Sequence, residues 1–250
     1  MEKYLVSIIT PLYNSEKYIK KTIKSVLNQS YKNWEMIIID DFSKDKGKKI
    51  VKNYAKNYSK INLIELDENK GAAFARNKGI EVSKGRFIAF LDSDDFWHHD
   101  KLKKQVKFML ENNYYFTYTK YQLVDKKGNI LNKNVNIKNK LNYRKLLFTN
   151  YIGCLTAMYD TKKLGKVYMP LIRKRQDYAL WLKILKKINY GYGLNETLAY
   201  YRIHNNSISS NKFELLRYQW KLYRDIENIS YLESLTYIFY TIIIKLLRIK

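Results

Sequence analysis

The sequence predicts an α/β fold built on a mostly parallel sheet with helices on its faces. In the first hundred residues, short apolar runs alternate with segments whose apolar residues recur at helical spacing. The apolar runs end abruptly at polar residues, as at Asp40-Asp41 and Asp92. Strands that alternate with helices form βαβ units, in which the strands lie parallel in one sheet.

The first predicted strand is the apolar run from Tyr4 to Thr10, and we expect Pro11 to end it. A helix follows, for which Asn14 or Ser15 can serve as the N-cap. Its apolar residues have the i, i+4, i+7, i+8 spacing of one helix face: Ile19, Ile23, Val26 and Leu27.

The next elements continue this alternation. They are a strand from Trp34 to Ile39, a helix at 46–58, a strand at 61–66, a helix at 71–83 and a strand from Arg86 to Leu91. Ligands of parallel sheets bind outside the carboxyl ends of the strands. Three polar clusters should therefore meet at one edge: Pro11-Leu12-Tyr13-Asn14, Asp40-Asp41 and Asp92-Ser93-Asp94-Asp95.

Beyond residue 100 the pattern is looser. A helix is expected around Leu102, Val106, Met109 and Leu110, and a hairpin at 114–131 that turns at Lys126-Lys127-Gly128-Asn129. A helix after Arg175 carries Tyr178, Leu182 and Leu185 on one face. A polar loop from His204 to Ser207 precedes a helix at 211–229.

The composition indicates a folded, basic chain of 250 residues, 46% hydrophobic, with a formal net charge of +24. Its single cysteine, Cys154, excludes a disulfide framework and a cysteine-based zinc site. Neither G-x-G-x-x-G nor G-x-x-x-x-G-K-[ST] occurs, which argues against dinucleotide oxidoreductases and P-loop NTPases. The first ten residues have the pattern of a strand rather than a signal peptide, so we expect a cytoplasmic protein.

The positive charge has two explanations. An AT-rich genome encodes lysine freely and would account for part of it. The remainder clusters in segment 126–145, which contains no acid, and in segment 162–187, whose only acid is Asp177. Such clusters suggest a face that meets an anionic partner, such as a phosphorylated substrate, a lipid surface or a nucleic acid. No basic helix has base-reading spacing, so we do not expect nucleic-acid binding.

The end of the chain, 231–250, is apolar and then basic. Its uncharged part, Ser234 to Ile244, is shorter than the about 20 residues that span a bilayer. Lys245, Arg248 and Lys250 would suit an interfacial helix beside anionic headgroups. A core helix or a dimer-forming helix is the alternative.

Asp92, Asp94 and Asp95 are candidate metal ligands. Carboxylates this close repel one another, and a folded protein rarely gathers them without a cation or another partner. Mg²⁺ and Mn²⁺ take oxygen ligands and bridge to substrate phosphates, so an ion here would stabilise a diphosphate leaving group. The alternative is a solvated turn or a helix cap.

Other residues could bind or react with a ligand. Asp40 or Asp41 could accept hydrogen bonds from a nucleobase or a ribose, Tyr13 could stack on a base, and Arg76 could pair with a diphosphate or with these carboxylates. Arg202 and His204 could also contact a diphosphate. His98 and His99 are adjacent, which suits chelation poorly, and we expect them to begin a helix.

Asp177 lies among basic residues in Arg173-Lys174-Arg175-Gln176-Asp177-Tyr178. A carboxylate near an acceptor could take the proton from its hydroxyl group, and the surrounding cations favour the ionised form that a base needs. The alternative is a structural salt bridge at the start of a helix.

Five motifs carry a resemblance to a known family: Val6 to Asn14, Ser25 to Ser30, Ile38 to Ser43, Gly71 to Asn77 and Asp92 to Asp95. Their order and spacing resemble those of the family 2 glycosyltransferases of the GT-A fold. The resemblance is close over residues 4–97. Farther along it rests on Gln176-Asp177-Tyr178, Trp181-Leu182 and Tyr201-Arg202-Ile203-His204.

The resemblance implies an inverting enzyme that uses a nucleotide-diphospho-sugar, most often UDP-linked, with Mg²⁺ or Mn²⁺. It implies that Asp177 is the catalytic base and that Asp94, with Asp92 or Asp95, binds the metal and the donor. Gln176 stands where the family commonly has Glu. The residues implied to hold the nucleotide or donor are Pro11, Tyr13, Asn14, Asp41, Arg76, Asp92 and Asp94.

The resemblance also implies a domain plan and an acceptor. We expect a GT-A domain at 1–210, with a nucleotide-binding half at 1–97 and an acceptor-binding half at 98–210, and a C-terminal helical extension at 211–250. Short bacterial members build lipooligosaccharide, lipopolysaccharide or capsule, so the acceptor would be a glycan or glycolipid and the enzyme peripheral at the inner face of the cytoplasmic membrane. A catalytically silent partner in a membrane-bound assembly complex is the alternative.

Overall fold

The computed structural model describes residues 3–203 and 212–246. Within these residues, ten strands form one sheet. The strands are β1 (Val6–Leu12), β2 (Trp34–Asp40), β3 (Ile61–Glu65), β4 (Phe87–Phe90), β5 (Phe96–Trp97), β6 (Phe116–Val124), β7 (Ile130–Val135), β8 (Lys140–Leu141), β9 (Met158–Asp160) and β10 (Gly191–Arg202). The helices are α1 (Ile19–Leu27), α2 (Gly47–Asn57), α3 (Ala72–Val82), α4 (Lys101–Glu111), α5 (Tyr143–Phe148), α6 (Thr161–Leu164), α7 (Gln176–Lys187), α8 (Lys212–Lys221) and α9 (Tyr231–Leu246).

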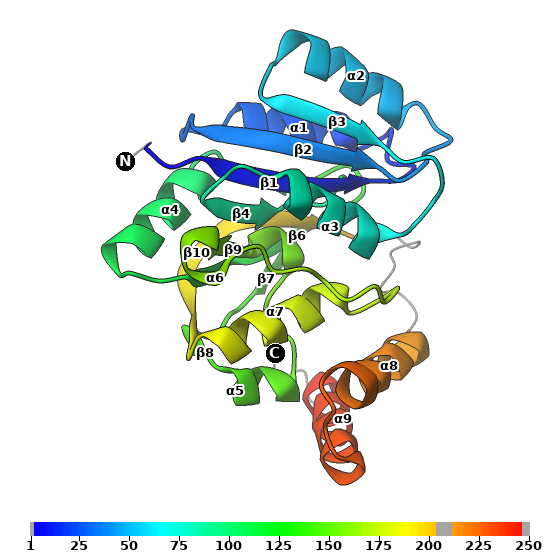
Figure 1. The fold of residues 1–250 in the computed structure, drawn as a ribbon, viewed down its shortest axis with the longest axis vertical. Helices are drawn as coiled ribbons and strands as arrows, with labels where there is room; N and C mark the ends of the chain where they lie inside the picture. The colour runs from blue at the N-terminus through cyan, green and yellow to red at the C-terminus, as the bar shows by residue number, and fades with distance from the viewer. Residues whose placement is uncertain (1–2, 204–211, 247–250) are drawn as a thin grey trace.

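The strand order is β3-β2-β1-β4-β9-β6-β10-β5, with β7 paired to β6 and β8 to β10 (Figure 1). The first half, β3-β2-β1-β4, is parallel, which confirms the predicted βαβ alternation. In the second half β9 runs antiparallel to both β4 and β6, so the sheet is mixed. The strands β5, β8 and β9 are two or three residues long. Such short strands leave no alternation in the sequence to detect.

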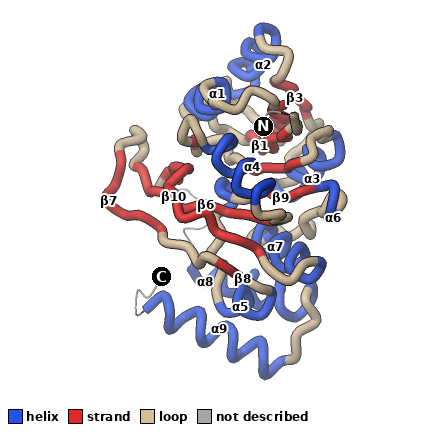
Figure 2. Tube along the Cα trace, turned by 90° about the vertical axis from the view of Figure 1, so that its left-hand side faces the viewer, coloured by secondary structure: helices blue, strands red, loops and turns tan. Residues whose placement is uncertain are grey.

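The sheet is covered on both faces by helices (Figure 2). In β1, the side chain of Ile8 belongs to the apolar cluster that includes residues of α1 and α4. The next residue, Ile9, belongs to the cluster that includes residues of α3 and α7. Successive side chains of a strand point to opposite faces. Because helices cover both faces of the sheet, all side chains of a central strand are buried. The central strands are therefore apolar throughout and do not alternate apolar with polar residues.

Pro11 does not end the first strand, because β1 continues to Leu12. The neighbouring strand β4 ends at Phe90, and its ladder with β1 stops at Ile9. The backbone nitrogen of Pro11 faces this side, so the N–H group that proline lacks has no ladder partner to lose. The prediction that Pro11 stops the strand was therefore wrong by two residues.

Neither Asn14 nor Ser15 caps α1, whose N-cap is Tyr18 without a side-chain hydrogen bond. The carbonyl of Ser15 instead accepts the backbone N–H groups of Tyr18 and Ile19, at 3.0 Å each. His98 and His99 do not begin a helix either, since α4 starts at Lys101. In both cases a turn lies between the polar residues that were expected to begin the helix and the residue at which the helix starts.

Helix α7 is fixed to the sheet by Trp181. The Trp181 ring stacks on Phe116 of β6, with centroids 5.3 Å apart, and meets Phe90 of β4 edge-on at 5.7 Å. The predicted face of Tyr178, Leu182 and Leu185 is buried. This packing sets the beginning of α7, and with it Asp177, close to the end of β4.

The C-terminal helices pack on one another and on α5, beside α7 (Figure 1). After α8 the chain continues as a π-helical segment, Leu222–Ile226, and then as α9. Ser234, Thr241 and Ile244 of α9 are buried. None of the described helices is long and apolar enough to cross a membrane.

Gly79 allows α3 to lie close to the sheet. A Cβ atom at this position would lie 2.6 Å from Cγ2 of Ile9 and 2.8 Å from Cδ1 of Ile39, both of which are fully buried. We expect Gly79→Ala to lower the free energy of unfolding by about 1–2 kcal/mol, because overpacking outweighs the better helix propensity of alanine. Denaturant unfolding measures this. Lys78→Ala, in the same helix and partly exposed, should change stability little, and equal effects would contradict the explanation.

Candidate functional site

The carboxyl ends of β1, β2 and β4 lie side by side at one edge of the sheet. The Asp41 N–H donates to the carbonyl of Leu12 at 2.8 Å, and the Leu91 N–H donates to the carbonyl of Ile9 at 3.0 Å. The Ser93 hydroxyl donates to that of Ser15 at 2.9 Å. The structure thus brings together the three polar clusters that follow these strands.

Asn14 joins the loops that follow β1 and β2. It has a left-handed backbone, with φ of 47°. Its N–H donates to the Ser43 hydroxyl at 3.1 Å, and its side-chain oxygen accepts the Lys44 N–H at 2.8 Å. The neighbouring Tyr13 is 50% exposed, so its ring is accessible to a planar ligand.

Asp41 organises the loop before α3. Its carboxylate accepts the backbone N–H groups of Lys70 at 2.7 Å and Gly71 at 2.9 Å. Gly71 has φ of 87°, a conformation that favours glycine. Both oxygens of Asp41 are therefore engaged within the protein, and its contact with a nucleotide remains a prediction.

Arg76 of α3 reaches the acidic run Asp92-Ser93-Asp94-Asp95. The side chain is 6% exposed, and its Nη2 donates to Oδ1 of Asp92 at 2.5 Å. Burial opposes the charge, but the Asp92 carboxylate raises the pKa of Arg76 above its ordinary value. Its Nε and Nη1 find no partner among the described residues. These are unsatisfied donors that an anionic ligand could use.

The acidic run is held by Thr22 and Arg202. The Thr22 hydroxyl lies 2.9 Å from the carbonyl of Ser93 and 2.7 Å from that of Asp95. The backbone N–H of Arg202 donates to Oδ1 of Asp95 at 2.8 Å, and its Nε donates to the carbonyl of Asp94 at 2.8 Å. Arg202 thus fixes the backbone of this loop in place.

The Arg202 guanidinium also binds the hairpin turn between β6 and β7. Its Nη1 donates to the carbonyls of Lys126 at 2.8 Å and Asp125 at 3.1 Å. Nε and Nη1 of Arg202 thus already have partners within the protein. The contact of Arg202 with a diphosphate remains a prediction. His204, predicted with it, lies outside the described residues.

The carboxylates of the acidic run crowd one another. Burial, followed by the charges of Asp94 and Asp92, raises the pKa of Asp95 well above its ordinary value. Burial also raises the pKa of Asp92, against the opposing effect of Arg76. Oδ2 of Asp95 is buried and has no partner among the described residues. A divalent cation would relieve this repulsion, so the residues fit Mg²⁺ or Mn²⁺.

Asp177, in the first turn of α7, lies close enough to the acidic run for its charge to act on the carboxylates there. Its charge contributes to raising the pKa of Asp92 and that of Arg76. The carboxylate is half-buried and accepts no hydrogen bond from the described residues. The basic neighbours point elsewhere: Lys174 pairs with Glu214 at 2.5 Å and Arg175 donates to Gln219 at 3.0 Å.

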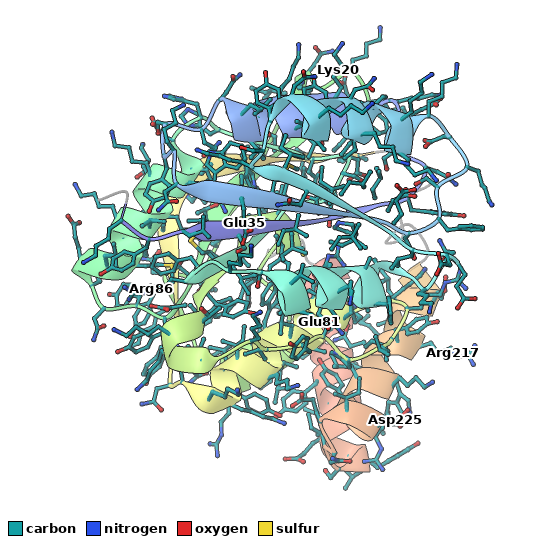
Figure 3. All side chains as sticks on the ribbon, turned by 45° about the horizontal axis from the view of Figure 1, so that its top comes forward. Lys20, Glu35, Glu81, Arg86, Arg217 and Asp225 are labelled. Atoms are coloured by element: carbon teal, nitrogen blue, oxygen red, sulfur yellow. The ribbon has the colours of Figure 1, made fainter. Side chains whose placement is uncertain are left out.

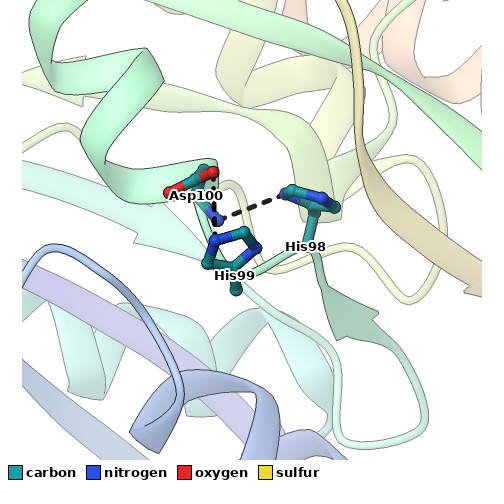
Figure 4. Close-up of side chains that lie close together, drawn as sticks. All are labelled: His98, His99 and Asp100. Atoms are coloured by element: carbon teal, nitrogen blue, oxygen red, sulfur yellow. Dashed lines mark hydrogen bonds and ion pairs between the residues drawn. The ribbon is translucent and has the colours of Figure 1, made fainter.

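His98, His99 and Asp100 form a separate cluster before α4 (Figure 4). Nδ1 of His98 accepts the backbone N–H of Asp100 at 3.2 Å, and Nε2 of His99 lies 3.1 Å from Oδ2 of Asp100. The carbonyls of His98 and His99 accept hydrogen bonds from Gln29 and Ser30. These contacts assign the segment a role in joining α4 to the end of α1.

Thr22 is a residue of the site that the sequence motifs did not indicate. It is buried on the face of α1 that also carries Ile19, Ile23 and Val26. A polar residue in an apolar helix stripe was the available signal, because a buried hydroxyl needs a partner. The partners of Arg175 and Lys174 on α8 carried no comparable signal, since they lie about 40 residues away along the chain.

Comparison with known proteins identifies relatives of this chain. The family model described as Glycosyl transferase family 2 matches residues 7–164. The putative teichuronic acid biosynthesis glycosyltransferase TuaG of Bacillus subtilis is 48% identical, over 93% of this chain and 92% of that protein. The Escherichia coli UDP-Glc:alpha-D-GlcNAc-diphosphoundecaprenol beta-1,3-glucosyltransferase WfgD is 43% identical, over 91% of this chain and 89% of that protein.

The fold is similar to solved structures. The crystal structure of S. aureus TarS in complex with UDP-GlcNAc aligns with a TM-score of 0.73 and 22% identity, over 95% of this chain and 71% of that one. A mannosyltransferase from Pyrobaculum calidifontis, in complex with GDP-Man and Mn²⁺, aligns with a TM-score of 0.71 and 15% identity, over 94% of this chain and 70% of that one. These similarities establish the GT-A fold.

A divalent cation should stabilise the protein through the acidic run. We expect Mn²⁺ or Mg²⁺ to raise the melting temperature relative to EDTA, and Asp94→Asn to remove most of this increase. In EDTA, Asp95→Asn should be at least as stable as the wild type, because burial and the charge of Asp94 oppose an ionised carboxylate here and the amide oxygen can still accept the Arg202 N–H. Thermal unfolding measures both effects.

His99→Gln serves as the control for the separate histidine cluster. If this variant loses the stabilisation by Mn²⁺ and Asp94→Asn keeps it, the ion binds at the cluster and the assignment to the acidic run is wrong.

Proposed function

Because the chain belongs to glycosyl transferase family 2, we propose that this enzyme moves a hexose or N-acetylhexosamine from a UDP-linked donor to a hydroxyl of a lipid-linked bacterial surface glycan. The observation that carries the proposal is the geometry of Asp177. Its half-buried carboxylate takes no hydrogen bond from the described residues. It lies close enough to Asp92 and Arg76 for its charge to contribute to their pKa shifts.

The donor assignment draws on the site and on relatives. Arg76 has unsatisfied donors beside the acidic run, which suits a diphosphate between a guanidinium and a divalent cation. The Escherichia coli relative WfgD is named as using UDP-Glc. Tyr13, half-exposed after β1, would stack on the uracil ring, and Asn14 and Pro11 would shape the loop that holds it.

The acceptor assignment rests on the names of relatives and on the positive charge of this chain. WfgD is also named for an acceptor on diphosphoundecaprenol, which is anionic and lipid-linked. The net charge of +24, with basic clusters at 126–145 and 162–187, complements such a molecule. TuaG is named for teichuronic acid, another surface glycan. We infer an acceptor of this class rather than one particular glycan.

The proposed reaction is a single displacement with inversion. Asp177 accepts the proton of the acceptor hydroxyl while that oxygen forms a bond to the anomeric carbon. The bond from this carbon to the diphosphate oxygen breaks on the opposite side. Asp92, Asp94 and Asp95 would hold a divalent cation, which would neutralise the charge that develops on the diphosphate. Arg76 fixes Asp92 and faces the same charge.

The place of action is proposed to be the cytoplasmic face of the membrane. Helix α9 exposes three apolar side chains at i, i+3, i+7 spacing, which places them on one helix face: Leu232, Leu235 and Phe239. The exposed rings of Tyr231 and Tyr240 lie beside this row, against Trp220 and Phe148 respectively. An amphipathic helix of this kind can lie in the interface of a bilayer. A lipid-linked acceptor would be reached from that position.

Asp177→Asn should remove transfer and spare nucleotide binding. We expect turnover to fall by about 10²- to 10⁴-fold, since the base is lost, while UDP binds as in the wild type. UDP release from a panel of nucleotide-sugars with Mn²⁺, with UDP-glucose first, measures turnover, and calorimetry measures UDP binding.

Asp225→Asn, at an exposed carboxylate of the π-helical segment, is the matched control and should behave as the wild type (Figure 3). Lost UDP binding in Asp177→Asn would assign this residue to binding rather than proton transfer. If the wild type releases UDP from no donor of the panel, the chain is a silent partner and the proposed activity is wrong.

Membrane contact can be tested with vesicles. We expect the chain to float with vesicles that contain anionic phosphatidylglycerol, and the double variant Leu235→Asp, Phe239→Asp to lose about tenfold or more in binding, since it places two charges in the apolar face. The variant Asn53→Asp, Asn57→Asp adds the same charge on exposed positions of α2 and should still float. Equal losses in both variants would mean that net charge, not α9, drives binding.

A further inference from the structure

Arg175, two residues before Asp177, has an unusual backbone. Its φ of 67° and ψ of 12° are in the left-handed region, and it is the N-cap residue of α7 without a side-chain cap hydrogen bond. A residue with a Cβ atom costs about 1–2 kcal/mol in this conformation. Such a conformation persists where surrounding contacts hold it. The position of the first turn of α7 therefore depends on what holds Arg175.

Gln219 of α8 is the contact that holds the Arg175 side chain. Nη2 of Arg175 donates to Oε1 of Gln219 at 3.0 Å. The amide nitrogen of Gln219 donates to the hydroxyls of Tyr223 at 2.8 Å and Thr241 at 3.0 Å. Gln219 is 1% exposed, and its carbonyl and both N–H groups are used. The amide is thus a fixed junction between α7, the π-helical segment and α9.

The residues on both sides of Arg175 and Asp177 are held by the same helices. Lys174, 8% exposed, pairs with Glu214 of α8 at 2.5 Å. On the other side, the Tyr178 hydroxyl lies 3.2 Å from that of Tyr223 and donates to the carbonyl of Leu146 at 2.7 Å. Asp177 itself has no hydrogen bond from the described residues, so its place is set by these neighbours.

The network continues into α9 and back to α5. The Thr241 hydroxyl accepts from Gln219 and donates to the carbonyl of Phe148 at 2.8 Å. The Tyr223 hydroxyl donates to the carbonyl of Leu147 at 2.5 Å. Every hydroxyl in the chain of contacts therefore has a partner. Nε of Arg175 is buried without a partner among the described residues, so the arrangement of these elements is defined by the hydroxyls and the Gln219 amide, which are satisfied.

We propose that Gln219 is a positioning residue for Asp177, and that the C-terminal helices hold the proposed base in its place through the contacts of Gln219 with Arg175 and Thr241. The inference rests on the proposed function, because it takes Asp177 to be the base. Gln219 acts on Arg175, not on the donor or the acceptor. The C-terminal helices are then part of the catalytic apparatus, in addition to any contact with a membrane.

Thr241 offers the sharpest substitution, because it lies on α9 and can be changed without loss of volume. Thr241→Val removes the hydroxyl that accepts from Gln219, and Thr241→Ser keeps it. We expect Thr241→Val and Gln219→Met to lower kcat by about tenfold to a hundredfold, since small displacements of a base are costly, with the dissociation constant of UDP unchanged. Thr241→Ser should restore most of the rate.

Thr236→Val is the matched control on the same helix, because Thr236 is exposed and its hydroxyl donates only to Leu232 of its own helix. The rate should be calculated per folded molecule, from UDP release from UDP-glucose with Mn²⁺, in full-length protein without lipid. If all variants lose stability but keep the rate per folded molecule, Gln219 has only a structural role and the proposal is wrong.

Hydrogen exchange separates this proposal from the proposed function. We expect the backbone amides of residues 174–180 to exchange faster in Gln219→Met and Thr241→Val than in the wild type, and at the wild-type rate in Thr236→Val and Thr241→Ser. Unchanged exchange in the first two variants overturns the link, whatever the activity. Faster exchange with no wild-type turnover on any donor would keep the link and reject the transferase activity.

Discussion

The repulsion among the carboxylates that follow β4 is the constraint to which the surrounding structure responds. Asp92, Asp94 and Asp95 lie within a few residues, and burial raises the pKa values of Asp92 and Asp95. Arg76 neutralises one of them from α3, while Arg202 and Thr22 fix the backbone of the run from the far end of the sheet and from α1. Elements separated by up to 108 residues in the chain are thereby drawn to one edge.

The parallel half of the fold could be predicted from the sequence because its signals are local. Each strand is a continuous apolar run, and each helix shows its own periodicity, so β1, β2, β4 and the helices between them are within a few residues of expectation. The mixed second half could not, because β9 has three residues and β10 has an irregular pattern of burial with two register shifts against β6. Their pairing is decided by contacts between distant segments.

The candidate site also has one part that the sequence predicts and one part that it does not. The strand-end rule placed the clusters after β1, β2 and β4 together, since it depends only on the direction of the strands. The surroundings of Asp177 followed no such rule. Charge along the chain suggested that Lys174 and Arg175 surround the carboxylate, yet both side chains turn to α8. Sequence distance shows which charges are near in the chain, and the packing of α8 decides where they point.

The tie between Arg202 and the β6–β7 turn has a consequence for how this site can diverge. The guanidinium binds the turn only through main-chain carbonyls, those of Asp125 and Lys126. Any sequence that keeps the same turn offers the same two oxygens, whatever its side chains. The residues of this hairpin can therefore vary among descendants of one ancestor while the loop that carries Asp94 stays in register. Gly128 is the exception, because its φ of 88° would strain any residue with a Cβ atom.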